Sequence, residues 1–413
     1  MYAVAPARRD AVMPSQVADI VLHFSIPALE QTGSPALEAA ADIASAKSRV
    51  FGGEVLVSRL NPRKGRVVVV PPHMEAPAVA SSEFVVLVPK RDRVDARFLA
   101  YLIGEESFRQ SLDAQVRSVT RSHQRVEPEA ISQARVSLPE LDEQRRIADF
   151  LDDQVTRIDN IIAARREQTE RLGEHLEAFV ASAVVGRQVQ GDRRPMTAGW
   201  LDSVPATWPV QTVQSEFDVQ LGKMLDERKV VGDSLLPYLR NTNVQWDHID
   251  LTDLKQMDFA AHERPRFLLR RGDLLICEGG QPGRAAIWDA RVAAIGYQKA
   301  LHRARSRGRS SPRWLFYCLR AAVAAQVFTA GAEQATIVHL TGEQLRSLRF
   351  PFPPRAEQEA IIALLDAESA LLGEQRRTLD TSIALLQERK RSLITAAVTG
   401  ELDVTTARAG LPA

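Results

Sequence analysis

Cysteine is scarce in this sequence, and long apolar runs are absent. The 413 residues include two cysteines, Cys277 and Cys318, which cannot form a disulfide framework or a cysteine-based zinc site. No run reaches the roughly 18 consecutive apolar residues of a membrane span, and the opening MYAVAPARRDAVMPSQ lacks the apolar core of a signal peptide. We therefore expect a protein of the reducing cytoplasm with no membrane association.

The motifs of common catalytic sites are also missing. GGQPGR at 279–284 resembles a phosphate-binding loop, but no Lys-Ser or Lys-Thr follows it. Asn61-Pro62 lacks the second proline and the aromatic residue of the amino-methyltransferase motif, and no GxSxG turn, HExxH helix or spaced Cys/His set occurs. The sequence therefore predicts neither catalysis by this chain alone nor a cofactor or metal bound by it.

Charge is balanced, with 53 Lys and Arg residues against 52 Asp and Glu residues. The formal net charge of +1 does not exclude nucleic-acid binding, because only local basic patches matter for it. Arginine supplies most of the positive charge, and its guanidinium can bind phosphates and guanine edges with two hydrogen bonds. The length of the chain indicates two or more hydrophobic cores.

An internal repeat organises the sequence. DEQRRIADFLDDQ at 142–154 is similar to AEQEAIIALLDAE at 356–368, and Glu143 aligns with Glu357 at an offset of 357 − 143 = 214. The match runs without a gap from 139 to 186, which indicates a duplication. The same offset places Pro139, Ile147, Leu151, Asp152, Leu172, Val184 and Gly186 on Pro353, Ile361, Leu365, Asp366, Leu386, Val398 and Gly400.

Each copy predicts a long helix with a heptad seam, whose apolar positions alternate in steps of four and three. About 33 helical residues would form a rod of roughly 50 Å. We expect the two helices to pair as an antiparallel coiled coil; the alternative is two separate amphipathic helices packed on globular units. The seams are Leu151, Val155, Ile158, Ile162, Arg165, Thr169, Leu172, Leu176, Phe179 and Ala183, and Leu365, Ser369, Leu372, Arg376, Leu379, Ile383, Leu386, Lys390, Leu393 and Ala397.

The regions before the two helices also match. Residues 52–70 resemble 271–288, each read as strand, Gly-containing loop and strand, and 96–103 parallel 312–319 as amphipathic helices. We therefore predict four parts: a globular unit at 1–138, a helix at 139–190, a globular unit at 191–350, and a helix with a tail at 351–413. The stretch 187–199 is the expected linker.

Loops that combine Arg, Lys, Asn, Gln, Ser and His are candidates for DNA contact, because these side chains bind base edges and phosphates. Such loops occur in both halves, although an ordinary solvated turn is the alternative for any single residue. Gly65 and Gly283 would allow either close approach of a ligand or a tight turn. The candidates are Arg59, Asn61, Arg63, Lys64, Arg66, Arg121, His123, Arg125, Lys223, Arg240, Asn241, Asn243, Gln281, Arg284, Gln298 and Lys299.

As a set, these motifs resemble the specificity subunit of type I restriction-modification systems over nearly the whole chain. They are the P-x-L/R-x-E-Q-x-x-I-x-x-x-L-D openings at Pro139 and Pro353 and the helix ends AVVG at 183–186 and AVTG at 397–400. In the second half they include YLRNTNVQWDHID, GDLLICEGG, and the run from WLFYCL to Ala335-Thr336 and His339-Leu340. The departure is the short N-terminus: either the first globular unit is shortened, or the true start of the chain lies elsewhere.

The resemblance implies an α+β fold in which two target recognition domains alternate with the two paired helices. Each domain would read half of an asymmetric bipartite DNA site, while the helices would set the spacer and dock two methyltransferase subunits. S-adenosylmethionine would be bound by those partners, and ATP and Mg²⁺ by a motor-nuclease restriction subunit. The chain itself would be non-catalytic. Two alternatives remain: a coiled-coil scaffold without DNA recognition, and a stand-alone nuclease or methyltransferase.

Overall fold

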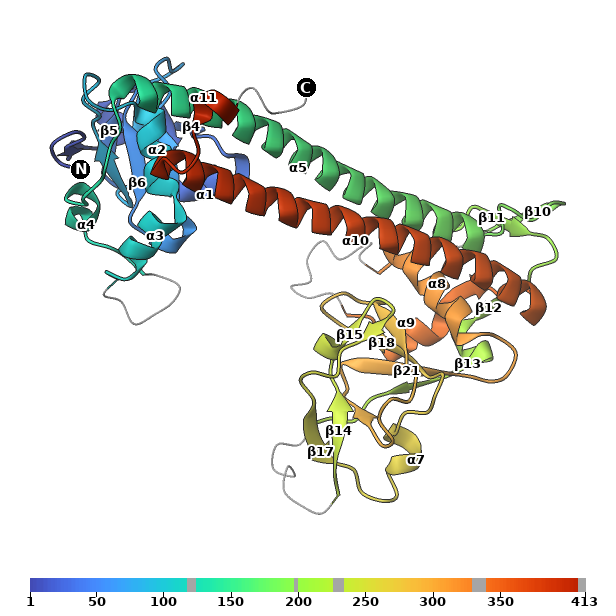
Figure 1. Ribbon diagram of the computed structural model, residues 1–413. Coiled ribbons are helices and arrows are strands. Elements are labelled where there is room, and N and C mark those ends of the chain that lie inside the picture. The colour runs from blue at the N-terminus through green and yellow to red at the C-terminus, as the bar shows by residue number, and fades with distance from the viewer. Residues whose placement is uncertain (117–123, 197–199, 226–233, 329–338, 408–413) are drawn as a thin grey trace. The chain divides into compact units, whose positions relative to one another are not determined.

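The computed structural model describes residues 1–116, 124–196, 200–225, 234–328 and 339–407. It divides into two compact units: unit 1 comprises Met1–Arg166 and Asp380–Ala413, and unit 2 comprises Glu167–Leu379. Two long helices, α5 (Leu141–Val184) and α10 (Arg355–Thr399), each contribute to both units. Helices and sheets are both present, as expected for an α+β chain (Figure 1).

Unit 1 contains a four-stranded and a five-stranded sheet. The four-stranded sheet has the order β1-β9-β6-β7, and all its pairs are antiparallel. In the other, β2-β5-β8-β3-β4, strands β3 and β8 run parallel. The bounds are β1 (Ala7–Arg8), β2 (Ala11–Val12), β3 (Ile20–Phe24), β4 (Ala36–Ala39), β5 (Lys47–Val50), β6 (Val55–Ser58), β7 (Val67–Val69), β8 (Ala78–Ala80) and β9 (Phe84–Leu87).

Unit 2 repeats this topology. Its four-stranded sheet, β13-β21-β18-β19, is antiparallel, and in the three-stranded sheet β17-β14-β20 strands β14 and β20 run parallel. The duplication therefore extends from the helices to both sheets, although among the described residues the second sheet of unit 1 has two further strands, β2 and β5. The bounds are β13 (Phe217–Leu221), β14 (Leu235–Leu239), β17 (Lys255–Asp258), β18 (Leu274–Cys277), β19 (Ala285–Ile287), β20 (Gly296–Tyr297) and β21 (Leu301–Ser306).

Shorter elements complete the two units. Unit 1 has helices α1 (Ile26–Thr32), α2 (Ala96–Gly104), α3 (Glu106–Asp113), α4 (Pro128–Ser132) and α11 (Val404–Ala407), and the short 3-10 helices η1 (Pro14–Gln16), η2 (Ala40–Asp42) and η3 (Pro62–Lys64). Unit 2 has α6 (Val213–Glu216), α7 (Arg264–Phe267), α8 (Pro312–Ala324), α9 (Gly342–Ser347) and η5 (Asn241–Asn243), with strands β10 (Arg193–Pro195), β11 (Ser203–Pro205), β12 (Val210–Thr212), β15 (Val244–Gln245), β16 (His248–Ile249) and β22 (Arg349–Pro351).

The predicted amphipathic segments before the long helices are α2 and α8. Asp95 caps the first by accepting from the backbone N–H groups of Arg97 and Phe98, and Ser311 caps the second at Arg313. Phe98 of α2 packs with Leu151 of α5 in unit 1, and Leu315 of α8 packs in one cluster with residues of α5 and α10 in unit 2. This pair of predictions is confirmed.

The heptad seams are visible in the burial of the long helices. All ten predicted positions of α5 are buried or half-buried, and so are those of α10 except the exposed Arg376. The helices end as predicted, because Gly186 and Gly400 have positive φ values of 66° and 80°, which glycine adopts without steric cost. Among the described helices, α5 and α10 included, none has both the length and the apolar character needed to cross a membrane.

Each unit has a polar contact between the two long helices. In unit 1, Asp159 of α5 binds Lys390 of α10 with both carboxylate oxygens at 2.7 Å. In unit 2, His175 Nε2 lies 3.2 Å from Glu368 Oε1. Of the two α5 residues, the one nearer the N-terminus thus meets the α10 residue nearer the C-terminus.

Residues 187–196, the described part of the predicted linker, are tied to neighbouring elements. Strand β10 pairs antiparallel with β11, and Arg193 at its start donates to the carbonyls of Val185 and Gly186, both at 2.9 Å. These contacts satisfy carbonyls that the end of α5 leaves without helical partners. The predicted linker is therefore anchored to the end of α5 by Arg193.

Candidate nucleic-acid interface

In unit 1, the loop after β6 carries most of the predicted DNA-contacting residues, and helix α1 holds it in place. Glu30 of α1 accepts from Lys64 Nζ at 3.0 Å and ion-pairs with Arg66, whose side chain is 11% exposed. Hydrogen bonds from Arg66 and then Lys64 lower the pKa of Glu30. Arg66 also donates to the Leu60 carbonyl at 3.0 Å, so its role in this structure is to shape the loop.

A second group of cations in unit 1 converges on Glu83. Arg125 binds both oxygens of this carboxylate at 2.8 to 3.1 Å, and the Arg59 Nε lies 3.9 Å from it. The hydrogen bond to Glu83 raises the pKa of Arg125. Arg63, by contrast, is exposed and donates to the Gln124 side-chain oxygen at 3.2 Å.

The structure thus brings Arg59, Arg63 and Arg125 to one loop region, where residue 60 also bridges to residue 125. Asn61 is buried with φ 49° at the start of η3, a turn position that suits asparagine. Arg121 and His123 lie outside the described residues.

In unit 2, two loops meet at Asn241. The Asn241 side chain donates to the Gly279 carbonyl at 2.7 Å, and its oxygen accepts from Arg284 Nη2 at 3.2 Å. Gln281 stands exposed on the same loop as Arg284. The GGQPGR stretch and the Asn-Thr-Asn turn therefore form one cluster, a contact that the sequence did not predict.

Two other candidates near this cluster serve the fold. Asn243 is 3% exposed; it donates to the Asp250 carbonyl at 3.0 Å and accepts from the backbone N–H of Arg240 at 2.9 Å. Arg240 is ion-paired with Asp253 at 2.6 Å. A buried amide that is used in this way shapes the turn, so we expect base contacts from its exposed neighbours.

Lys223, Gln298 and Lys299 form a separate cluster in unit 2. Lys223 and Gln298 make a parallel bridge, and the backbone N–H of Lys299 donates to the Lys223 carbonyl at 2.9 Å. The Lys223 ammonium is held by Glu263 at 2.5 Å and by the Asp258 carbonyl at 2.7 Å. The Lys299 side chain is exposed, and so it is the cation of this cluster that can reach a phosphate.

The glycines of the two loops are explained by packing. A Cβ on Gly283 would lie 2.5 Å from the Phe328 ring, and one on Gly65 would lie 2.2 Å from the Arg109 side chain. Both glycines also have positive φ values, 88° and 59°. Of the two predicted roles, the tight turn is therefore sufficient for each.

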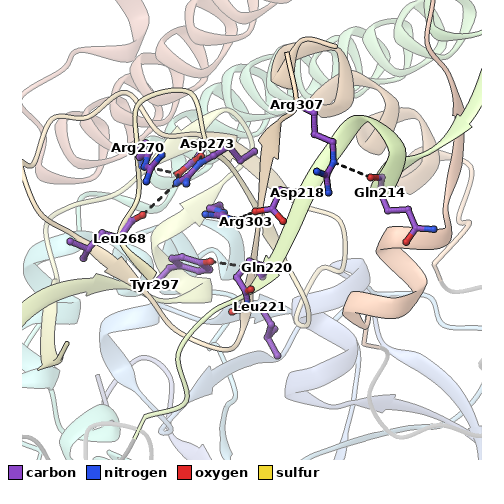
Figure 2. A network of polar contacts seen from close by, with 11 residues as sticks. Gln214, Asp218, Gln220, Leu221, Leu268, Arg270, Asp273, Tyr297, Arg303 and Arg307 are labelled. Atoms are coloured by element: carbon purple, nitrogen blue, oxygen red, sulfur yellow. Dashed lines mark hydrogen bonds and ion pairs between the residues drawn. The ribbon is translucent and has the colours of Figure 1, made fainter. Parts of the chain in front are cut away.

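Many arginines of unit 2 are used internally, and sequence reasoning gave no account of this. Arg303 is buried and ion-pairs with Asp218, while Arg305 binds the two oxygens of the buried Asp273 at 2.7 and 2.6 Å. Figure 2 shows this network beside Tyr297. The sequence did contain a signal for these ion pairs. Arg303, Arg305 and Arg307 occupy alternate positions along and just after β21, and Asp218 lies opposite Arg305 in the neighbouring strand.

Sequence reasoning also missed the elements that face the two loops. Between its corresponding strands, β3 and β4, unit 1 has helix α1; between β14 and β17, unit 2 has η5 and the hairpin β15–β16. Helix α1 binds the first loop through Glu30, and in unit 2 the backbone N–H of Asp247 donates to the Ala285 carbonyl at 3.1 Å. Two copies of one framework therefore present their loops against different elements.

The repeated Glu-Gln pair joins each globular part to its long helix. Gln144 is 1% exposed; it accepts from the backbone N–H of Asp95 at 3.0 Å and donates to the carbonyls of Arg93 and Pro139. Gln358 accepts from the Ser311 backbone at 2.9 Å and donates to the Pro353 carbonyl at 2.8 Å. Each glutamine therefore ties the start of a long helix to the start of α2 or α8.

Comparisons with known proteins agree with this organisation. Residues 45–171 match the model of the type I restriction modification DNA specificity domain. A solved structure described as the structural basis of complex assembly and conformational transition of the type I R-M system is 19% identical, with a TM-score of 0.74 over 97% of this chain and 96% of that one. The HsdS subunit from Thermoanaerobacter tengcongensis is also 19% identical, with a TM-score of 0.50 over 97% and 95% of the two chains.

No curated protein matches the sequence. At 19% identity, the structural similarity establishes the shared fold. Together with the match of residues 45–171, it confirms the resemblance to type I restriction-modification specificity subunits that the sequence motifs indicated.

Proposed function

We propose that this chain is the DNA-specificity subunit of a type I restriction-modification complex, in which each unit reads one half of an asymmetric bipartite site. The observation that carries the proposal is that the two units share one sheet framework, but their corresponding loops pack against different elements. The loop of unit 1 packs against helix α1, and the loop of unit 2 packs against the β15–β16 hairpin. Similar frameworks can engage similar stretches of duplex, while the different neighbours of the loops would give each half-site its own sequence.

Base readout in this proposal falls to the exposed members of the clusters and to the half-buried Arg284. Arg63 in unit 1 and Gln281 in unit 2 are exposed on the loops, and Arg284 is held in place by Asn241. Arginine and glutamine pair with guanine and adenine edges through two hydrogen bonds. Lys64 and Lys299 would instead contact phosphates, which provide affinity without sequence information.

The long helices would act as a spacer paired as an antiparallel coiled coil. The half-buried seams and the Asp159–Lys390 and His175–Glu368 contacts support this pairing. Methyl transfer to adenine would come from two methyltransferase subunits that bind S-adenosylmethionine and dock on the helices. Cleavage would need restriction subunits that use ATP and Mg²⁺.

The spacer role has a geometric test. Deleting seven residues from each helix, 163–169 and 377–383, keeps the heptad register and shortens a helix by about 10 Å, which corresponds to about three base pairs of duplex. We expect the complex of this chain with its methyltransferase to methylate adenines in the same two half-sites with a spacer shorter by about three base pairs. Arg166→Ala, at an exposed position of the same segment, should leave the spacer unchanged.

A scaffold without DNA recognition is the alternative, and sequence-mapped methylation separates the two. If the assembled complex methylates adenines irrespective of the flanking sequence, the proposed function is wrong. If both half-sites persist but the spacer does not follow the deletion, only the spacer role is wrong.

A further inference from the structure

Arg313 of α8 joins three elements of unit 2. Its Nε and Nη2 atoms lie 2.8 and 2.7 Å from Asp366 Oδ1 on α10. On its other side the guanidinium ion-pairs with both carboxylate oxygens of Asp247, with Nη2 2.7 Å from Oδ2. Asp247 lies in the turn between β15 and β16, so one side chain links the hairpin to the long helix.

The corresponding arginine of unit 1 is bound differently. Arg97 of α2 contacts Asp149 at 2.8 Å and Asp152 at 2.9 Å, and both carboxylates belong to α5. Asp152 corresponds to Asp366 at the repeat offset (366 − 152 = 214), but the position of Asp149 is taken by Ala363 (363 − 149 = 214). In unit 2 the hairpin therefore supplies the carboxylate that the long helix lacks.

The hairpin is also packed against the candidate interface. The Trp246 ring meets the Phe316 ring of α8 edge-on at 5.7 Å, and the Arg313 guanidinium lies 4.5 Å from the same Phe316 ring. The backbone N–H of Asp247 donates to the carbonyl of Ala285, the residue after Arg284. Asn241, which holds the Arg284 guanidinium, begins the turn that leads into β15. A shift of the hairpin would therefore move Arg284 and the Asn241 side chain that holds it.

We propose that Asp247 is a positioning residue for base readout by unit 2, acting through its ion pair with Arg313. This inference rests on the proposed function and deepens it. The ion pair holds the hairpin, and with it Asn241 and Arg284, at a fixed place on α8 and α10. Unit 1 has no equivalent dependence, because Arg97 binds carboxylates of α5 and the loop of that unit is held by Glu30.

Asp247→Asn is a suitable change because it removes the charge and leaves the shape. The residue has a positive φ of 57°, which asparagine tolerates well. Arg313 would keep Asp366 and would remain near the Tyr317 hydroxyl at 3.3 Å. The matched control is Asp149→Asn in unit 1, which removes one of the two α5 carboxylates from Arg97 and touches no reading loop.

The experiment is a selection from a duplex library with a randomised central segment, using the full chain as wild type, as Asp247→Asn and as Asp149→Asn. Base preference is read at each position, and thermal unfolding is recorded for every variant. We expect two blocks of preference for the wild type, with about a tenfold loss of discrimination in one block for Asp247→Asn, a size typical of one misplaced base contact. Asp149→Asn should retain both blocks.

Arg313→Lys provides a second variant, since lysine keeps the charge but cannot bind both carboxylates through a planar fork. It should weaken the same block as Asp247→Asn. The inference is overturned if both variants keep both blocks at wild-type discrimination, if both blocks weaken together, or if Asp149→Asn has the same effect. A wild-type chain that selects no sequence at all would overturn the proposed function, and this inference with it.

Discussion

The side-chain oxygen of Gln358 accepts a 2.9 Å hydrogen bond from the backbone N–H of Ser311, the residue that caps α8. Gln144 makes the equivalent bond to Asp95, the cap of α2. Both glutamines are 1% exposed. The repeated Glu-Gln sequence thus marks a buried joint, in which the glutamine satisfies backbone groups that water cannot reach.

Gln358→Ala should destabilise unit 2 by about 2 to 4 kcal/mol, because it leaves a buried N–H and a buried carbonyl without partners. All five tryptophans lie in unit 2, so tryptophan fluorescence during urea unfolding reports that unit. Gln144→Ala should change the circular dichroism transition and leave the fluorescence transition in place. The control is Gln375→Ala, which changes an exposed glutamine of the same helix. If it lowered the stability of unit 2 as much as Gln358→Ala does, the buried hydrogen bonds of Gln358 would not be the cause.

The two lysines of the second cluster in unit 2 should behave differently. Lys299→Ala is expected to weaken binding of the full chain to any duplex and to reduce the salt slope by about one unit, the signature of one lost phosphate contact. Lys223→Ala should instead lower the stability of unit 2, because its ammonium is committed to Glu263. Fluorescence anisotropy of a labelled duplex at graded salt measures the first effect. A salt slope that Lys299→Ala leaves unchanged would remove this residue from the interface.

The helical part of this fold could be read from the sequence because a heptad seam is a local pattern. The ends of the two helices could be predicted for the same reason, because Gly186 and Gly400 closely follow the last apolar positions of the seams. The order of the strands in the sheets could not be predicted, because Ala7 of β1 pairs with Leu87 of β9, 80 residues later (87 − 7 = 80), and no local periodicity indicates that pairing.

DNA contact by the candidate residues stays a prediction, but the structure shows what surrounds them. The sequence named Asn241 and Arg284 as separate candidates, and their contact appears only in the structure. Residue type alone did not reveal that Arg66 is neutralised by Glu30, 36 residues earlier, or that Asn243 is buried. Such facts depend on which carboxylate or carbonyl the fold brings opposite a side chain, and sequence spacing does not contain them.

Acid should weaken unit 2 through His302. This ring is fully buried, and burial lowers its pKa, against the opposing effect of the Nε2 hydrogen bond to the Leu340 carbonyl. The unfolded chain therefore takes up a proton near pH 6.5, whereas the folded chain takes it up only at a lower pH. The contribution of the neutral His302 to the stability of unit 2 is fully present above that pH and is lost as the pH falls below it. His302→Gln should flatten this dependence of the fluorescence-detected unfolding midpoint between pH 7 and 5; an unchanged slope would exclude His302 as its origin.

Alkali should weaken the same unit through Tyr317. Burial, and then the hydrogen bond to Asp366, raise the pKa of this phenol to about 12. Because an unfolded tyrosine ionises near pH 10, the neutral phenol stabilises the folded state fully below that pH, and this contribution is lost as the pH rises toward 12. Tyr317→Phe should cost about 1 to 2 kcal/mol at neutral pH, since it removes a hydrogen bond to a carboxylate, and should lessen the loss between pH 10 and 12. Tyr101→Phe, which removes the equivalent bond to Asp152 in unit 1, should leave the tryptophan transition unmoved. If both substitutions shift that transition equally, the Tyr317–Asp366 bond does not hold α8 to α10 in the way the structure indicates.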